Sequence, residues 1–486
     1  MSVRFAVLAF LLLAGPALAA DPPRPNVVFI LADDLGYTDV ACFGSKYYET
    51  PNIDRLAAQG LRYTHGYTCG PNCQPTRAAL MTGQYGPRTG IYTVGSTDRF
   101  DTTSRPLVPV PNVVDLDLAK TTVAESMKKA GYATAMFGKW HLGQRDGYHP
   151  SQQGFDEAIV SAGKHFNFNT SPKVDVPEGA YLADFLTDKA VDFIERNRTK
   201  PFFLYLPHYG VHSPYQAKED IIARFKDKAA VGGHHDPTYA AMIASVDESV
   251  GRVVAKIDEL GLGKNTLIIF SSDNGGVGGY SRAGVFKNTG KGEITDNAPL
   301  RGGKGMLYEG GVRVPWVVRW TDTIKPGSAS TQPILSVDLH PTLLELSGGV
   351  APDNQPLDGV SLVASLKSGG EKPLGREDLF WHFPGYLGAA GNSWRTTPAS
   401  AIRHGDYKLI EFFEDGRLEL YDVVKDAGQE KDLAKEKPDM VKDLHARLVA
   451  WRESVNAPIP EKRDDSTKAP AAPKKKGKGK KAAKAA

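Results

Sequence analysis

The sequence predicts a doubly wound α/β domain with a mostly parallel sheet, followed by a small α+β part that contains an antiparallel sheet. Two observations lead to this prediction. Short, nearly continuous runs of aliphatic, β-branched and aromatic residues recur along the chain, as is typical of strands covered on both faces. Amphipathic stretches that end in glycine or asparagine lie between them, and strands that alternate with helices form parallel sheets flanked by helices.

Four runs predict the central strands. They are residues 26–31 (NVVFIL), 133–137 (ATAMF), 201–206 (PFFLYL) and 266–272 (TLIIFSS). Helices are predicted over residues 122–130, 181–197 and 239–260, and a further helix begins near Cys73 and ends before Gly83.

The pattern changes after about residue 370. Residues 400–413 and 417–423 alternate between polar and apolar side chains and are joined by a Glu-Asp-Gly turn, which predicts an antiparallel hairpin. Residues 440–455 predict a terminal amphipathic helix. We therefore expect a large α/β domain over residues 21–370 and an α+β subdomain over residues 371–462.

Both ends of the chain have compositions that differ from the rest. Residues 1–20 combine Arg4, an apolar run and a small-residue ending, which predicts a cleaved signal peptide and a secreted or periplasmic protein without a membrane span. Residues 463–486 are rich in lysine and alanine and are predicted to be disordered. The formal charge of +3 comes from eight lysines in this tail, so the body is mildly acidic and nucleic-acid binding is not expected.

The three cysteines, Cys42, Cys69 and Cys73, are too few for a disulfide framework. An odd number in an oxidising compartment leaves one unpaired. If Cys73 has a special fate, Cys42 and Cys69 remain as a possible pair, and the other interpretation is that they are small buried hydrophobic residues.

Polar side chains follow each of the four predicted strands at the point where the strand ends. They are Asp33 and Asp34, Lys139 and His141, His208 and His212, and Asp273 and Asn274. Ligand sites in open α/β sheets lie outside the carboxyl ends of the strands, so we expect these residues to meet at one edge.

The types of these residues indicate a chemistry. The three aspartates and Asn274 offer only hard oxygen ligands, which suits Ca²⁺ or Mg²⁺ better than Zn²⁺. Arg77, Lys139 and the histidines add cations and acid–base groups, and a metal beside such cations forms a pocket for a tetrahedral oxyanion. The sequence therefore predicts an anion-ester hydrolase with one hard metal.

A family resemblance extends this interpretation. The segment CQPTR (Cys73 to Arg77) with the following AALMTGQYGPRTGI resembles the type I sulfatase signature C-x-P-S-R. The segments FILADDLGYTDV, TPNIDRLAAQG, GYATAMFGKWHLG, YGVHSPY, SDNGG, LRGGKGMLYEGGVRVP and LYDVVKDAGQEKDLA resemble further blocks of that family, in its usual order. The resemblance covers nearly all of the chain between the predicted signal peptide and the tail. Thr76 stands where the family usually has serine, but the maturation signal depends mainly on Cys, Pro and Arg.

The resemblance implies an alkaline-phosphatase/sulfatase-like fold and a set of roles. A maturation enzyme would oxidise Cys73 to Cα-formylglycine, whose hydrate is the nucleophile. One Ca²⁺ per chain would be bound by the modified Cys73 together with Asp33, Asp34, Asp273 and Asn274. Arg77 and Lys139 would hold the hydrate. His212, aided by Lys304, would assist departure of the alcohol, and His141 would take the proton that releases sulfate.

Export and the carbohydrate-active branch of the family imply a sulfated polysaccharide or oligosaccharide as substrate. Candidate residues for the substrate pocket are His165, Asn167, His382, Trp394 and Arg395, each of which fits an ordinary loop role equally well. The cluster His234-His235-Asp236 precedes a helix and is interpreted as a surface or capping cluster.

Two other classes of function are alternatives to sulfate-ester hydrolysis. A phosphodiester or phosphonate hydrolase with formylglycine and an inactive sulfated-glycan-binding protein remain alternatives. Two-zinc phosphatases of the same superfamily need a Ser or Thr nucleophile and additional histidine ligands, where this chain has Asp273-Asn274. The glycine-rich run at residues 301–311 matches neither nucleotide-binding loop pattern.

Overall fold

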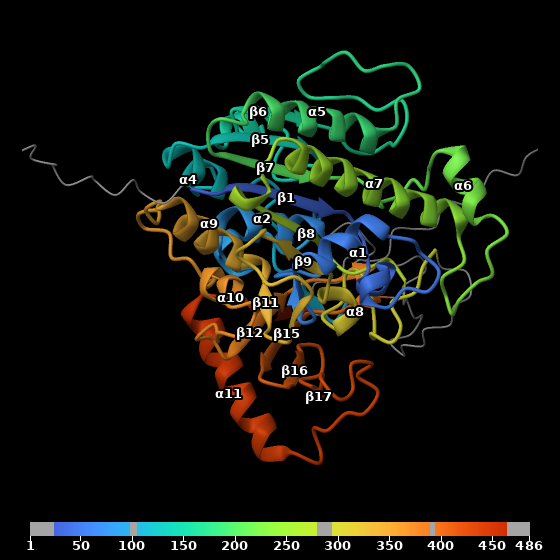
Figure 1. Ribbon diagram of the computed structural model, residues 1–486. Coiled ribbons are helices and arrows are strands. Elements are labelled where there is room, and N and C mark those ends of the chain that lie inside the picture. Colours follow the sequence, from blue (N-terminus) through green and yellow to red (C-terminus); the bar gives the residue numbers. More distant parts are fainter. Residues whose placement is uncertain (1–23, 98–104, 279–293, 389–393, 464–486) are drawn as a thin grey trace, which may run out of the picture.

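The computed structural model describes residues 24–97, 105–278, 294–388 and 394–463, and Figure 1 shows their arrangement. The predicted signal peptide (residues 1–20) and nearly all of the lysine-rich tail lie outside these residues. Within the described part of the chain, no helix is both long and apolar enough to cross a membrane.

An eight-stranded, mostly parallel sheet forms the centre of the molecule, as predicted. Its order is β10-β2-β9-β8-β1-β7-β5-β6. The strands are β1 (Asn26–Ala32), β2 (Leu61–Tyr63), β5 (Ala133–Gly138), β6 (Glu157–Val160), β7 (Phe202–Pro207), β8 (Thr266–Ser272), β9 (Trp316–Arg319) and β10 (Ser328–Ser330). Strand β9 is antiparallel to both of its neighbours, β8 and β2. The four predicted strands are adjacent in the order β8-β1-β7-β5, and the sequence did not indicate the short strands β2, β6, β9 and β10.

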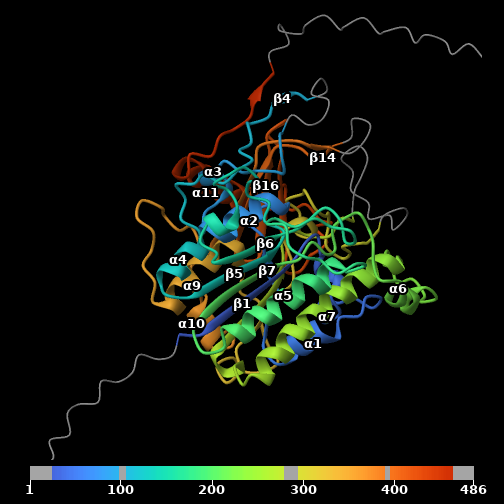
Figure 2. The same cartoon turned by 90° about the horizontal axis from the view of Figure 1, so that it is seen from above.

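Helices cover both faces of this sheet (Figure 2). Alternate residues of β1 separate the two layers, because Val28 and Ile30 pack into one apolar cluster while Phe29 and Leu31 pack into the other. The first cluster contains side chains of α1 (Pro51–Ala58), α5 (Leu182–Arg196) and α7 (Pro237–Glu259). The second contains side chains of α2 (Cys73–Thr82), α4 (Val123–Lys129) and α9 (Leu339–Ser347).

Local signals account for the helix ends. Thr122 caps α4 by accepting a hydrogen bond from the Glu125 amide, and the Glu125 carboxylate accepts from the Thr122 amide in return. Asp236 caps α7 by accepting from the amide of Tyr239 at 2.8 Å. The interpretation of residues 234–236 as a capping cluster is therefore confirmed for Asp236.

The C-terminal part contains a four-stranded antiparallel sheet and the terminal helix α11 (Pro438–Ser454). The strands are β12 (Asp378–Phe383), β15 (Ala399–His404), β16 (Tyr407–Phe412) and β17 (Leu418–Asp422). The prediction of one hairpin was incomplete. Residues 400–413 form two strands, because Gly405 has a φ of 55° and turns the chain back between them. The predicted Glu-Asp-Gly turn joins β16 to β17.

The two parts of the fold share an apolar core. Tyr67, Leu307 and Val337 pack in the same cluster as Trp381 and Ile410 of the antiparallel sheet. The sequence left open whether Cys42 and Cys69 pair, and the structure has no disulfide between them. All three cysteines are free, and Cys69 packs in this shared core while Cys42 packs beside the layer of α1, α5 and α7.

Candidate active site

The predicted site residues meet because four neighbouring strands end beside one another. Strand β1 lies between β7 and β8 and is parallel to both, and β5 pairs with the other edge of β7. The residues that follow these strands therefore converge at one edge of the sheet. Helix α2 begins there with Cys73, which is 1 % exposed.

Each carboxylate at this edge is contacted by a cation. Both Nε and Nη2 of Arg77 donate to Asp273 Oδ2, at 3.0 and 2.6 Å. Lys139 Nζ donates to Asp33 Oδ2 at 2.6 Å. Lys304, from the glycine-rich run 270 positions further along the chain, reaches Asp34 with its Nζ 2.7 Å from Oδ2. The site is thus a compact block of alternating charges.

Four of the predicted metal ligands form one cradle. The ligand atoms of Asp33, Asp34, Asp273 and Cys73 all lie within 4.8 Å of one another. Asn274 donates from Nδ2 to Asp34 Oδ1 at 2.9 Å, and its buried Oδ1 has no hydrogen-bond partner among the described residues. An unpaired buried oxygen beside three carboxylates fits a hard cation such as Ca²⁺.

The charges of the cradle perturb one another. Burial alone would raise the pKa of Asp33, but the charges of Lys139, His212 and Arg77 hold it well below its usual range. The pKa of Asp34 is lowered in the same way, against burial, chiefly by Lys304. Burial and then the charge of Asp33 raise the pKa of Asp273 to about 6. A bound cation would relieve this repulsion between the carboxylates.

Cys73 is not activated as a thiol. Its Sγ lies 3.5 Å from Asp33 Oδ1 and 3.9 Å from Asp34 Oδ1. Burial raises the pKa of the Cys73 thiol far above its usual value. Because the thiolate is the reactive form of cysteine, an unmodified Cys73 is a poor nucleophile at neutral pH.

The two candidate acid–base histidines differ in their surroundings. His141 has a φ of 65°, a left-handed conformation that is uncommon outside glycine and that recurs at functional sites. Burial, with the charges of Lys139 and Arg77, lowers the pKa of His141 to about 2. His212 Nδ1 lies 2.7 Å from the carbonyl oxygen of Ser213, to which it can donate, and its Nε2 lies 3.7 Å from Asp34 Oδ2.

Several candidate residues do not face this site. His208 lies at the end of β7, but its Nε2 pairs with Ser249 on α7 at 2.8 Å. His382 is buried between Ser400 and the carbonyl of Pro458. His165 is 1 % exposed, and its Nε2 lies 2.8 Å from the His212 carbonyl oxygen, which the protonated nitrogen can contact as a donor.

The remaining substrate candidates are on loops or at the limit of the described residues. Asn167 is exposed, with a φ of 48°. Trp394 and Arg395 belong to β14 (Trp394–Thr396), and their side chains lie outside the described part of the structure.

Sequence reasoning missed two residues that hold the site together. The ring of Tyr209 stacks on His212, with centroids 5.0 Å apart, and Lys139 Nζ lies 5.6 Å from its centroid. Asn297 Nδ2 lies 3.0–3.1 Å from three carbonyl oxygens, those of Gly276, Gly278 and Gly302. The aromatic residue between the two histidines of PHYGVH was a signal for Tyr209, whereas nothing local singled out Asn297.

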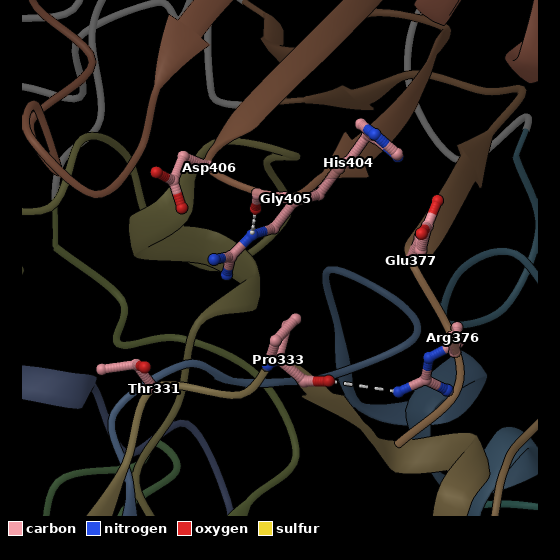
Figure 3. Close-up of a pocket in the computed structure, with 8 residues that line it drawn as sticks. Thr331, Pro333, Arg376, Glu377, His404, Gly405 and Asp406 are labelled. Atoms are coloured by element: carbon pink, nitrogen blue, oxygen red, sulfur yellow. Dashed lines mark hydrogen bonds between the residues drawn. The ribbon is translucent and has the colours of Figure 1, made fainter. Parts of the chain in front are cut away.

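A separate pocket lies near the turn between β15 and β16. It has a volume of about 330 Å³ and is lined in part by Arg376, Glu377, His404 and Asp406. Figure 3 shows Arg376 directed toward the backbone of Pro333, whose carbonyl accepts a hydrogen bond at 3.3 Å. No residue that lines this pocket is among the predicted site residues.

Comparison with known proteins agrees with the geometry. The family model "Sulfatase" matches residues 25–350, and the model "N-sulphoglucosamine sulphohydrolase, C-terminal" matches residues 303–454. A sulfatase of Formosa agariphila is 34 % identical over 93 % of this chain and 94 % of its own. Human N-acetylgalactosamine-6-sulfatase is 32 % identical over 73 % of this chain and 68 % of its own. The crystal structure of Ps i-CgsB superposes with a TM-score of 0.73 at 29 % identity, covering 88 % of this chain and 92 % of that chain. The same protein has been solved in complex with k-i-k-neocarrahexaose.

Proposed function

The chain belongs to the sulfatase family and is a sulfuric ester hydrolase, and we propose that it acts through a Cα-formylglycine formed from Cys73 and one Ca²⁺. The observation that carries this proposal is the cradle itself. Three carboxylates and Cys73 present their ligand atoms within 4.8 Å of one another at the start of a helix. Arg77, Lys139 and Lys304 contact the same carboxylates.

The residues of the cradle fit the metal. Asp33, Asp34, Asp273 and the orphaned Oδ1 of Asn274 would hold Ca²⁺ as hard oxygen ligands. When bound, Ca²⁺ supplies Lewis-acid polarisation of the sulfate ester, and the formylglycine hydrate supplies a hydroxyl nucleophile with a second hydroxyl for release. A formylglycine-generating enzyme is the partner that this chemistry requires.

The side chains around the cradle then have separate tasks. Arg77 and Lys139 are fixed by Asp273 and Asp33 and orient the nucleophile at the start of α2. His212 donates a proton from Nε2 to the departing alcohol oxygen, and Lys304 lies against the same Asp34 carboxylate as His212. His141 accepts a proton, since its low pKa keeps the imidazole neutral at physiological pH.

The substrate we propose is a sulfated polysaccharide or one of its oligosaccharides. Support comes from relatives whose names specify sulfated sugars, such as N-acetylgalactosamine-6-sulfatase, and from the related structure with a bound neocarrahexaose. The predicted signal peptide supports a secreted or periplasmic location, where such polymers are encountered. The proposal includes the predicted division of the chain into a catalytic α/β domain over residues 21–370 and an α+β subdomain over residues 371–462.

Mass spectrometry and substrate comparison test the proposal together. The tryptic peptide of residues 63–77, from enzyme purified from its native host, should lose the mass that separates the cysteine side chain from an aldehyde. Turnover of an aryl sulfate should follow the converted fraction, and the Cys73→Ala variant should be inactive. A fully active preparation with an unmodified thiol would exclude the mechanism. Faster turnover of aryl phosphates or phosphonates than of sulfates would exclude the substrate class.

A further inference from the structure

The cradle contains a second ligand set that includes sulfur. The Sγ of Cys73, the imidazole of His212 and the carboxylate of Asp33 also present ligand atoms within 4.8 Å of one another. We propose that these three residues bind Zn²⁺ in any chain whose Cys73 is still a thiol, and that oxidation of Cys73 removes this site. Oxidation would thereby change the metal preference of the cradle.

The ligand atoms are already oriented for this role. Lys139 occupies Asp33 Oδ2 at 2.6 Å, which leaves Oδ1 facing Cys73 Sγ at 3.5 Å. His212 Nδ1 lies 2.7 Å from the carbonyl of Ser213 and can donate to it, so Nε2, which faces Asp34 Oδ2 at 3.7 Å, is the ring nitrogen that would coordinate the ion. Histidine ligands of zinc typically donate their other ring hydrogen to a carbonyl or carboxylate in this way.

The donor set selects zinc over calcium. Zn²⁺ binds thiolate, imidazole and carboxylate ligands together, whereas Ca²⁺ takes only oxygen ligands and gains nothing from the sulfur and the nitrogen. Three protein ligands leave the fourth tetrahedral position for water or for Asp34, whose Oδ1 lies 3.9 Å from Cys73 Sγ. Ligand atoms around a tetrahedral zinc are separated by roughly 3.5 Å, so a small inward movement from the observed spacing completes the site. The His212 side chain is 26 % exposed and gives the ion a route from solvent.

Binding needs no redox partner. The S–H bond of Cys73 breaks, its proton leaves to the buffer, and the thiolate forms the bond to Zn²⁺. Conversion of Cys73 to formylglycine eliminates the sulfur and leaves oxygen as the only donor at this position. The consequence is that an unconverted chain holds Zn²⁺ where a converted chain would hold Ca²⁺. The inference depends on the proposed function in one respect only, namely that Cys73 is converted to formylglycine in the mature enzyme.

The test uses the full chain produced without the maturation enzyme. Mass spectrometry first verifies that Cys73 is a thiol, and Zn²⁺ is then titrated against a chromophoric chelator in excess Ca²⁺. We expect one Zn²⁺ per chain and, with Co²⁺ as a probe, a sulfur-to-metal charge-transfer band. Cys73→Ser changes one atom and should weaken Zn²⁺ binding at least 100-fold. His212→Ala should weaken it at least 10-fold, while His149→Ala, at a partly exposed histidine outside the cradle, should leave it unchanged.

Two results would overturn the inference: no Zn²⁺ binding by the thiol form, or undiminished binding by Cys73→Ser. Cys73→Ala serves in the same comparison if circular dichroism shows that the serine variant is unfolded. The assay requires no sulfatase activity. A converted enzyme that fails to hydrolyse sulfate esters would therefore refute the proposed function without affecting this result, and the reverse also holds.

Discussion

Lys408 and Glu309 form a fully buried ion pair that joins the antiparallel sheet to the large part of the fold. Lys408 lies on β16, and its Nζ donates to Glu309 Oε1 at 3.0 Å, with both side chains 0 % exposed. Glu309 begins α8 (Glu309–Val312), five residues after Lys304 of the site. We expect Lys408→Met, which keeps the length of the side chain and removes its charge, to destabilise the protein strongly.

The magnitude follows from the contacts that remain. At 3.0 Å and an effective dielectric constant of about 20, the pair attraction is about 5.5 kcal/mol. Removing one member of a buried pair typically costs about 3–5 kcal/mol, because the other charge stays buried. Glu309 keeps its hydrogen bond from Tyr67 at 2.7 Å and its contact with Arg313 at 3.6 Å. We therefore expect a loss near the lower limit, about 3 kcal/mol.

Urea denaturation followed by tryptophan fluorescence measures this loss, and the Trp381 ring lies 4.7 Å from Lys408 Nζ. The matched control is Lys264→Met, which breaks an ion pair with Asp322 of similar length, 2.7 Å, whose side chains are 79 % and 61 % exposed. The control should show no measurable change. A double variant, Lys408→Met with Glu309→Gln, should recover part of the loss. If Lys408→Met is no less stable than Lys264→Met, the reasoning from burial is refuted.

Three further predictions follow from the site and the core. His141→Ala should lower kcat for an aryl sulfate by about 10²–10⁴-fold with little change in KM, and a change confined to KM would contradict the proposed role of His141 as a base. Burial lowers the pKa of His208, His340 and His382 from 6.5 to about 4. Between pH 6.5 and 4 the unfolded chain binds more protons than the folded chain, so the free energy of unfolding should fall as pH decreases, by up to about 3 kcal/mol per histidine. His382→Gln should reduce the difference in the free energy of unfolding that urea denaturation measures between pH 7 and pH 5. Asp247→Ala removes the carboxylate that accepts from the first amides of α1 and should cost about 1–2 kcal/mol in thermal denaturation, whereas an unchanged midpoint would show that α1 needs no such cap.

Much of the candidate site could be predicted because its residues are covalently next to strong local signals. Asp33 and Asp273 directly follow continuous apolar strands, and Cys73 begins a helix that ends at Gly83. A parallel sheet brings its carboxyl ends to one edge whatever the order of the strands. Their convergence therefore followed from the local pattern alone.

Other contacts depended on segments that no local pattern connects. His208 and His212 both follow β7, yet His208 continues the strand, with its amide bonded to the Leu31 carbonyl, and points its ring at α7. Only His212 turns toward the cradle. Asn297 ties together loops near residues 276 and 302, and its neighbours carry no motif.

The sequence by itself determined the fold class, the strand-end residues and the family. Buried strands, helix caps and catalytic motifs each depend on residues that are adjacent in the sequence, so they can be identified locally. The tertiary structure alone decided which cation pairs with which carboxylate and which histidine faces the site. It also decided that Cys42 and Cys69 lie in different cores. The physical reason is that these contacts arise when distant segments pack against one another, and such packing is set by the whole apolar core rather than by any one segment.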